Sequence, residues 1–318
     1  MPSAPAPLVA AYEAVPPALR AVALMVAAAF CLTGMNVSVK FIAGDIHPFA
    51  IAFFRHVIGV TLMAPLFLRR AGNPLRTSRL GLHGVRAALN VIAMLAYFLA
   101  LTLEPLATVV SLSFTAPLIA TVLAMAVLGE RVSILRGGAL LIGLAGALII
   151  LRPWSVSISE GALLLLLSST TWATALIVIK VLSRTETPVT ITLYASLLQI
   201  PFTLVAALFY WSWPTPGQFA VLVLIAICGS GAQLLLSQAF READATVVLP
   251  ADFTKLVFAG IAGWVLFAET PEIWIWIGGT VVFSGVLLNA VLDRRDRQRA
   301  ARLAPAAENR QSSGNQGA

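Results

Sequence analysis

The chain has 318 residues, of which 59% are hydrophobic and only 11% are charged, and its formal net charge is +7. Soluble globular domains carry about 25% charged residues, so this composition excludes an ordinary soluble fold. The apolar runs do not alternate apolar with polar residues, which excludes a membrane β-barrel and predicts an all-α polytopic membrane protein.

Ten apolar segments of membrane-spanning length follow a proline-rich lead over residues 1–17, which we expect to be disordered. The first segment is longer than the core of a signal peptide, so we interpret it as an uncleaved helix. The tail from residue 293 is basic and then polar, and we expect it to be disordered in the cytoplasm. The ten predicted segments are residues 18–43, 48–67, 85–103, 107–128, 133–151, 159–182, 189–209, 219–240, 245–268 and 273–292.

Basic residues outside the segments gather in alternate connections. One set of connections holds Arg20, five arginines between residues 69 and 86, and the arginine-rich tail, whereas the opposite set holds Arg152 alone. Because arginine and lysine accumulate on the cytoplasmic side of membrane proteins, we expect both termini in the cytoplasm. The same placement accounts for the positive net charge, so we expect a lipid bilayer and no nucleic acid as partner.

The chain contains two copies of one five-segment unit, predicted over residues 18–151 and 159–292. Residues 107–130 read ATVVSLSFTAPLIATVLAMAVLGE and residues 245–269 read ATVVLPADFTKLVFAGIAGWVLFAE, with Ala-Thr-Val-Val, Phe-Thr and a closing Glu in common. A unit with an odd number of spans enters the membrane upside down in its second copy. Inverted repeats of this kind are typical of secondary transporters, whose substrate site lies near the midplane between the repeats.

This organisation resembles the EamA branch of the drug/metabolite transporter superfamily. The resemblance rests on the inverted repeats, on VLGER and LFAET at the ends of the fourth and ninth segments, and on DIHPFAIAFFRHVIG at residues 45–59. It implies an inner-membrane carrier that moves a small organic metabolite by alternating access. Riboflavin, an S-adenosylmethionine-like cofactor and an amino acid are the expected cargo classes, and HPFAIAFFR at residues 47–55 is similar to the uptake members for the first two.

Several alternatives stay open beside an uptake carrier. The protein could export amino acids or drugs, or the duplication could serve a structural membrane protein. An intramembrane lipid-modifying enzyme would need His, Asp or Glu clustered at one membrane face, and no such cluster occurs, so we expect no enzyme. The sequence has no P-loop, HExxH or CxxC spacing, so we expect no metal, no cofactor and no direct use of ATP. A proton as coupling ion and a homodimer stay open.

Two ionisable residues, Asp252 and Lys255, lie well inside the ninth segment. They are three residues apart and share a helix face, and a rise of 1.5 Å per residue puts Lys255 about 16 Å deep. A charge at the centre of a membrane helix costs about 2.5–3.5 kcal/mol on insertion scales, and usually faces a partner or a wet cavity. The pair therefore binds substrate or proton, or it is a structural ion pair. Pro250, and Pro117 in the first copy, are predicted helix breaks that expose backbone groups.

Arg55 is expected about 10 Å below the outer end of the second segment, where three roles stay open. It could anchor a substrate carboxylate or phosphate, complement Asp252, or extend to the membrane surface. His56 is either a proton relay or a buried, hydrogen-bonded histidine. Other polar and aromatic groups within the segments suit a ring-bearing or zwitterionic cargo, or else join helices by hydrogen bonds. The candidate substrate contacts among them are Asn36, Asn90, Tyr97, Trp172 and Gln233.

Charged residues also lie at matching segment ends in the two copies. Lys40 and Lys180 are expected to extend toward the membrane surface, and Glu130 and Glu269 to cap a helix or to pair at a gate. Small residues on the fifth and tenth segments predict close helix packing, within the chain or between protomers. They are Gly137, Gly138, Gly143, Gly146, Gly278, Gly279 and Gly285.

Overall fold

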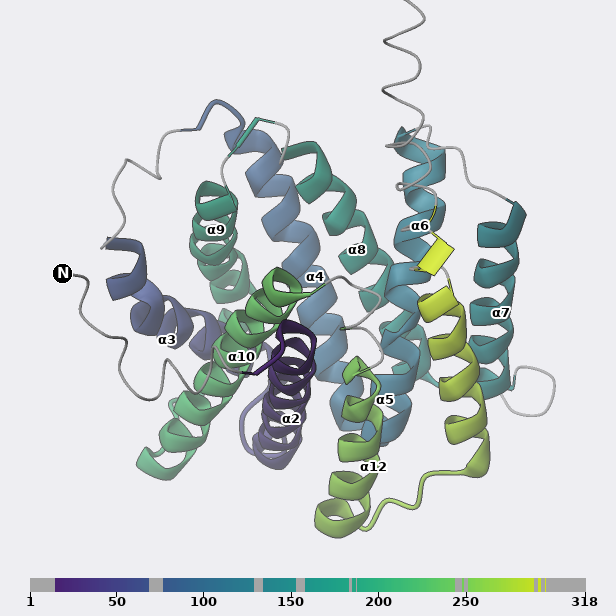
Figure 1. The fold of residues 1–318 in the computed structure, drawn as a ribbon. Coiled ribbons are helices and arrows are strands. Elements are labelled where there is room, and N and C mark those ends of the chain that lie inside the picture. The colour runs from purple at the N-terminus through teal and green to yellow at the C-terminus, as the bar shows by residue number, and fades with distance from the viewer. Residues whose placement is uncertain are drawn as a thin grey trace, which may run out of the picture.

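The protein is described here by a computed structural model, which covers residues 15–68, 77–128, 134–152, 158–182, 185–186, 188–243, 248, 251–288, 291–292 and 295. Within these ranges the chain forms helices and their connections, with no strand (Figure 1). The helices are α2 (Pro17–Ile42), α3 (Pro48–Leu68), α4 (Leu80–Leu103), α5 (Leu106–Ser113), α6 (Thr115–Leu128), α7 (Ile134–Leu151), α8 (Glu160–Leu182), α9 (Pro188–Leu208), α10 (Pro216–Glu242), α12 (Thr254–Phe267) and a last helix, Ile273–Leu288.

These helices account for the ten predicted membrane segments. Among the described residues, five helices are long and apolar enough to cross a membrane, one of them formed by α5 and α6 together, and five shorter apolar helices correspond to the other segments. The prediction of an all-α polytopic membrane fold is therefore confirmed. The predicted start of the third segment at residue 85 is wrong, because α4 begins at Leu80. Its first turn is held by His83, which is fully buried and stacks on Tyr194 of α9 with ring centroids 4.7 Å apart.

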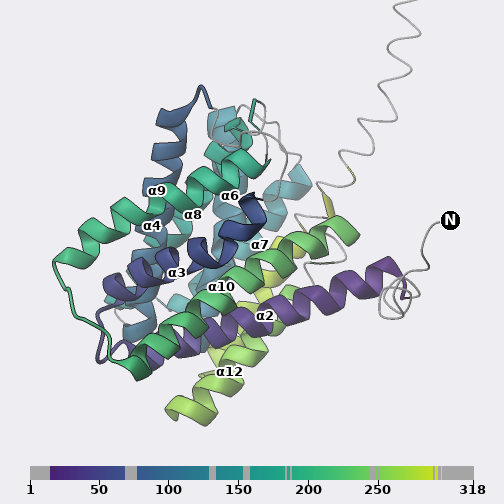
Figure 2. The same ribbon diagram turned by 90° about the vertical axis from the view of Figure 1, so that its left-hand side faces the viewer.

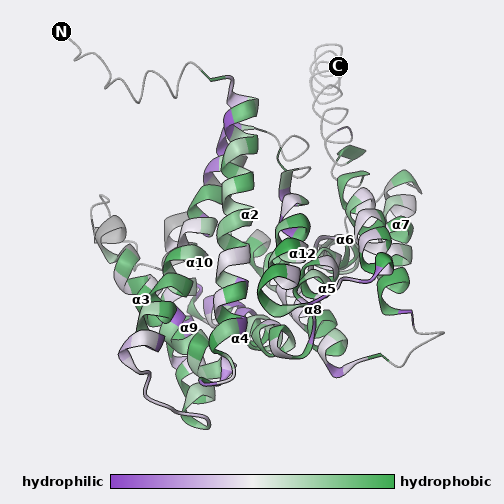
Figure 3. Cartoon of the chain, turned by 90° about the horizontal axis from the view of Figure 1, so that it is seen from below, coloured by the Kyte–Doolittle hydropathy of each residue, from purple (hydrophilic) through white to green (hydrophobic). Residues whose placement is uncertain are grey.

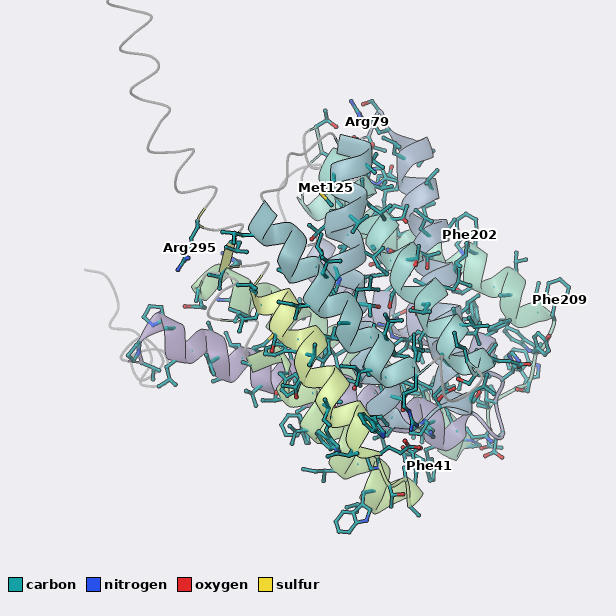
Figure 4. All side chains as sticks on the ribbon, turned by 90° about the vertical axis from the view of Figure 1, so that its right-hand side faces the viewer. Phe41, Arg79, Met125, Phe202, Phe209 and Arg295 are labelled. Atoms are coloured by element: carbon teal, nitrogen blue, oxygen red, sulfur yellow. The ribbon has the colours of Figure 1, made fainter. Side chains whose placement is uncertain are left out.

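The outer surface of the helices is apolar, as Figure 3 shows by the green that covers most of their length. Phe41, Phe202 and Phe209 point away from the bundle in Figure 4, and Phe209 is 79% exposed. Large apolar side chains exposed over so much of a molecule are unfavourable in water but match the hydrocarbon core of a bilayer.

The two repeats are packed across one another. α2 packs against α10, and α8 packs against α4, which is the same contact made by the equivalent helices of the opposite repeat. The pairs α3–α9 and α5–α12 each join a helix to its own equivalent. Figures 1 and 2 both show α2 lying along α10. The core is therefore built between the repeats, and its contacts follow the twofold relation expected of an inverted duplication.

Helix α7 and the last helix meet backbone to backbone through glycines. A Cβ at Gly146 would lie 2.4 Å from the nitrogen of Val282 and 2.8 Å from the carbonyl of Gly278, so only glycine fits there. Gly278 and Gly285 make backbone contacts of the same kind, whereas a Cβ at Gly143 or Gly279 would meet side chains, those of Leu118 and of Leu256 and Ser111. A Cβ at Gly137 or Gly138 would meet no atom within 4 Å. Close packing is thus present within the chain at five of the seven glycines.

The fourth span is interrupted at Phe114, where α5 ends and α6 begins. Pro117 lies three residues further on, and its nitrogen has no hydrogen to donate to the carbonyl of Ser113, the last residue of α5. The hydroxyl of Thr115 donates to the carbonyl of Leu112 at 2.7 Å and so satisfies one carbonyl at the interruption.

The ninth span has the matching irregularity at Phe253, which directly precedes α12. The hydroxyl of Thr254 donates to the carbonyl of Ala251, also at 2.7 Å. The Phe-Thr pair shared by the two copies therefore marks the same local geometry in both. Pro250, the predicted break of this span, lies outside the described residues.

Candidate functional site

A cavity of about 540 Å³ lies between the two repeats. Pockets for small-molecule ligands measure about 300–1,000 Å³, so a metabolite of vitamin size fits this one. Helices from both repeats line it, and each predicted site residue that the structure describes is among the lining residues. They are Asn36, Arg55, Asn90, Tyr97, Pro117, Trp172, Gln233, Asp252 and Lys255.

The two ends of the helices can be assigned to opposite sides of the molecule. Arg20 at the start of α2 pairs with Glu242 at the end of α10 at 3.1 Å, so these two ends share one side. The cavity lining on α10 comes from residues 229–236, in the half of that helix toward this side. Asp252 and Lys255, near the start of the ninth span, lie in the same half.

On the opposite side lies a cluster of polar groups around Lys40, at the end of α2. Its ammonium group pairs with Glu269 and donates to the carbonyl of Glu104 at 2.7 Å. Glu269 in turn accepts the N–H of Leu106, the first residue of α5, at 2.9 Å. The side chains of Lys40 and Glu269 are only 16% and 14% exposed. We call Lys40, Glu269, the Glu104 carbonyl and the Leu106 amide the Lys40 cluster.

The Lys40 cluster differs in part from the sequence interpretation. Lys40 is held by partners from α4 and from the end of α12, and does not extend freely to the surface, whereas Glu269 both pairs and caps α5. Glu130 and the side chain of Lys180, the matching residues of the other copy, lie outside the described part of the chain.

Asp252 and Lys255 pair with each other at 2.7 Å, and their side chains are 14% and 19% exposed. The ammonium group of Lys255 also lies 4.2 Å from the ring centroid of Phe114, at the interruption of the fourth span. Phe114 stacks on Phe253 with ring centroids 6.0 Å apart. The charge pair therefore lies where the interrupted spans of the two repeats meet.

Arg55 lines the cavity with an incomplete set of partners. Its Nη1 donates to the sulfur of Met94 at 3.0 Å, and its Nε is buried without an acceptor. In the described part of the chain no carboxylate lies within 4.0 Å of it, and Asp252 is paired with Lys255. The interpretation of Arg55 as the counter-charge of Asp252 is thus not realised in this conformation.

Asparagine amides supply unused acceptors to the same cavity. Asn36 donates from Nδ2 to the hydroxyl of Tyr97 at 3.0 Å. The side-chain oxygens of Asn36 and Asn90 are buried without a donor, and the two residues are only 4% and 6% exposed. A buried acceptor without a donor is unfavourable, so these oxygens fit a ligand or water that carries hydrogen-bond donors.

His56 joins the two repeats at the cavity wall. Its Nδ1 lies 2.9 Å from the carbonyl of Ala52 and its Nε2 lies 2.8 Å from Oε1 of Gln199 on α9. Both partners are acceptors, so the neutral ring donates its one N–H to one of these oxygens, as in the interpretation of His56 as a buried, hydrogen-bonded histidine.

The lining residues that sequence reasoning misses include Arg86 and Phe114. Sequence reasoning assigns Arg86 to the basic connection before the third segment, because it lies only one residue from the predicted start of that segment at residue 85. In the structure it lies within α4 and donates to the carbonyl of Ile191 at 2.6 Å. Phe114 is masked in the sequence by its apolar surroundings, although the repeated Phe-Thr pair was the available signal.

Comparison with known proteins gives one family match and several similar proteins. The model of the EamA-like transporter family matches twice, over residues 19–152 and 159–291. The chain is 34% identical over 274 residues to a riboflavin transporter of Brucella anthropi, covering 83% of this chain and 95% of that protein. It is 27% identical over 252 residues to an S-adenosylmethionine uptake transporter of Rickettsia prowazekii, covering 79% and 86%. It is 30% identical over 266 residues to the pseudopaline exporter CntI of Pseudomonas aeruginosa, covering 82% and 92%.

Proposed function

The chain belongs to the EamA-like transporter family, and on this basis we propose that it carries a ring-bearing organic metabolite by alternating access of the central cavity. It is a multi-pass transporter of the bacterial inner membrane. The cargo class follows from relatives named for riboflavin and S-adenosylmethionine, both of which contain a fused aromatic ring system. The two repeats that move against each other are residues 18–151 and 159–292.

The central cavity is the observation on which this proposal depends. Its volume suits a vitamin or cofactor, and its wall combines the aromatic side chains of Tyr97, Phe98 and Trp172 with the amides of Asn36 and Asn90. Aromatic rings provide flat apolar faces for a planar cargo, while a few placed polar groups fix its orientation. A purely structural bundle has no need of a cavity with placed polar groups between its halves.

Alternating access requires that one side of the cavity close while the other opens. In this conformation the Lys40 cluster ties α2, α4 and α5 to the end of α12 on one side. Rocking of the repeats would separate Lys40 from Glu269, and the interruptions at Phe114 and Phe253 are the points where the spans can bend. With both termini in the cytoplasm, the Lys40 cluster is the outer closure.

Asp252 is our proposed coupling group, with a proton as the coupling ion. When its carboxylate is ionised it holds Lys255, and when it is protonated that attraction is lost. Protonation of Asp252 thus frees Lys255 to bind the cargo, so binding of the proton favours binding of the cargo, which is the linkage that secondary transport needs.

Counterflow into liposomes loaded with unlabelled cargo tests the carrier function. The probes are radiolabelled riboflavin, S-adenosylmethionine and tryptophan, and saturable exchange of at least one of them is expected. Asp252→Asn serves as the site variant, and Asp45→Asn, which replaces an exposed carboxylate in the turn after α2, serves as the control. Exchange of no probe above protein-free liposomes would contradict the proposal.

Export is the second candidate, favoured by the similarity to the pseudopaline exporter. Because counterflow runs in both directions, direction needs a different measurement. Accumulation from the cytoplasmic face in inverted membrane vesicles, with none in right-side-out vesicles, would establish export.

A further inference from the structure

Resting on the carrier function above, the geometry points to a subsite for an anionic group of the cargo, a carboxylate or a phosphate. Arg55 of α3 forms this subsite, and Gly229 of α10 leaves the space in which its guanidinium lies. Arg55 thereby selects the cargo by its charge, independently of the side chains that contact the cargo ring.

The charge balance of the cavity is the first reason. Arg55, Arg86 and Lys255 line it against a single described carboxylate, Asp252. Lys255 is neutralised by Asp252 at 2.7 Å, and Arg86 donates to the Ile191 carbonyl. Arg55 has no anionic partner in the described part of the chain. A cation held inside a membrane protein is unfavourable without a counter-charge, and an anionic cargo supplies one.

The position of the guanidinium is the second reason. A Cβ at position 229 would lie 2.9 Å from Nε and 3.0 Å from Nη2 of Arg55, so the side chain lies directly against the backbone of α10. Its Nη1 reaches Met94 of α4 at 3.0 Å, and a thioether is a weak acceptor. The guanidinium is thus held in place by packing while its donors are largely unspent. The planar fork of arginine matches the two oxygens of a carboxylate or phosphate.

The neighbouring acceptors define what accompanies the anion. The buried oxygens of Asn36 and Asn90 have no donor, so they favour a cargo that carries N–H or O–H groups. Tyr97, already hydrogen-bonded to Asn36, provides an aromatic ring beside them. The cargo that satisfies all of these groups has an anion, hydrogen-bond donors and a flat ring.

Matched pairs of probes that differ by one anionic group test the subsite by isothermal titration calorimetry of the purified protein in detergent. The pairs are riboflavin 5′-phosphate with riboflavin, S-adenosylmethionine with its decarboxylated form, and tryptophan with tryptamine. In at least one pair the anionic member should bind about tenfold more tightly or better. Arg55→Gln should remove that difference, and Arg55→Lys should retain part of it because the charge stays while the fork is lost.

Gly229 has a matched control two residues away. Gly229→Ala should lower the affinity for the anionic probe several-fold and leave the affinity for its neutral partner unchanged, because the added methyl group displaces the guanidinium. Gly231→Ala should change neither, since a Cβ there meets no atom within 4 Å.

Equal affinity within every pair, no binding of any anionic probe, or an anion preference that survives Arg55→Gln would each overturn the subsite. Flux of a probe in liposomes without any anion preference would overturn the subsite alone and leave the carrier function standing. A clear anion preference in binding with no flux of any probe would overturn the carrier function and leave the subsite standing.

Discussion

At the residue scale, Asp252 and Lys255 satisfy each other before any cargo arrives. Their 2.7 Å contact joins residues three apart across the irregularity at Phe253 and is mostly shielded from solvent. Such a pair contributes little net stability relative to apolar residues, but the loss of one partner leaves the other charge uncompensated. The pair is therefore suited to a site in which a cargo or a proton replaces one of the partners.

Neutralising one member of this pair should lower the free energy of unfolding more than neutralising both. Asp252→Asn or Lys255→Met alone should each lower the free energy of unfolding by about 3 kcal/mol, whereas the double variant should lose less than either. Thermal unfolding in detergent, followed by the fluorescence of a dye that does not react with thiols, compares the stability of the three variants. A double variant that loses the sum of the single changes would show that the two charges act independently.

His47, in the turn before α3, gives the protein a pH-dependent cap. Its Nδ1 accepts the N–H of Phe49 at 3.3 Å, and its ring stacks on Tyr210 with centroids 3.8 Å apart. Burial lowers the pKa of His47 below its ordinary value of 6.5. The folded state thus favours the neutral form of His47. The contribution of this cap to stability is therefore complete above pH 6.5 and is lost as the pH falls below that value.

Replacement of His47 by a cap that does not titrate should reduce this loss. His47→Asn keeps an acceptor for the N–H of Phe49, since asparagine is a favourable N-cap. The melting temperature of the variant should fall less than that of the wild type between pH 7 and pH 5. An equal fall in the melting temperatures of the two proteins would contradict the role of His47.

At the element scale, the apolar segments predict the spans well because length and hydropathy are local properties. Other features depend on the tertiary structure and could not be read from the chain. The start of α4 is missed because the polar His83 is buried by tertiary packing, which includes its stacking on Tyr194. The pairing of Lys40 with Glu269, and the lack of a carboxylate beside Arg55, follow from how distant helices pack.

The glycine contact between α7 and the last helix predicts opposite effects of two similar substitutions. Gly146→Ala places a methyl group 2.4 Å from the backbone nitrogen of Val282, and should cost about 1–3 kcal/mol. Gly137→Ala, with nothing within 4 Å, should stabilise by about 0.5–1 kcal/mol because alanine favours the helix. Melting temperatures of the two purified variants check the signs, and equal effects would contradict backbone contact at Gly146.

The Lys40 cluster should control access from its side of the membrane. A single reporter thiol, Ser113→Cys, is introduced with Cys31→Ser and Cys228→Ser, since Ser113, at the end of α5, lines the central cavity. Glu269→Gln weakens the attraction to Lys40, and should raise the rate of labelling by a membrane-impermeant maleimide several-fold.

Glu272→Gln is the matched control for this experiment. It removes the nearby ion pair with Arg152, in which the Glu272 side chain is 57% exposed, and exposed pairs contribute little. Equal labelling rates in the two variants would show that the Lys40 cluster does not close this side.

At the scale of the whole molecule, the inverted repeats explain how one chain can face both membrane sides. The contacts α2–α10 and α8–α4 are the same interaction made twice, so exchange of conformation between the repeats inverts the cavity without new kinds of contact. Figure 4 shows Arg79 at the top of the molecule, Arg295 at its left side and Phe41 near its lower edge. We propose that the side carrying the basic residues is the cytoplasmic one, as charge asymmetry predicts.

Reversible fixation of the Lys40 cluster tests alternating access most directly. Lys40→Cys and Glu269→Cys are combined with Cys31→Ser and Cys228→Ser, and a short bifunctional methanethiosulfonate joins the two thiols. A linker is used because the two side chains that meet here are long, whereas a disulfide joins Cα atoms only about 4.4–6.8 Å apart. We expect counterflow before cross-linking, loss of counterflow to the protein-free level after it, and recovery when a reductant releases the linker. Undiminished counterflow through fully cross-linked protein would contradict alternating access between the two repeats.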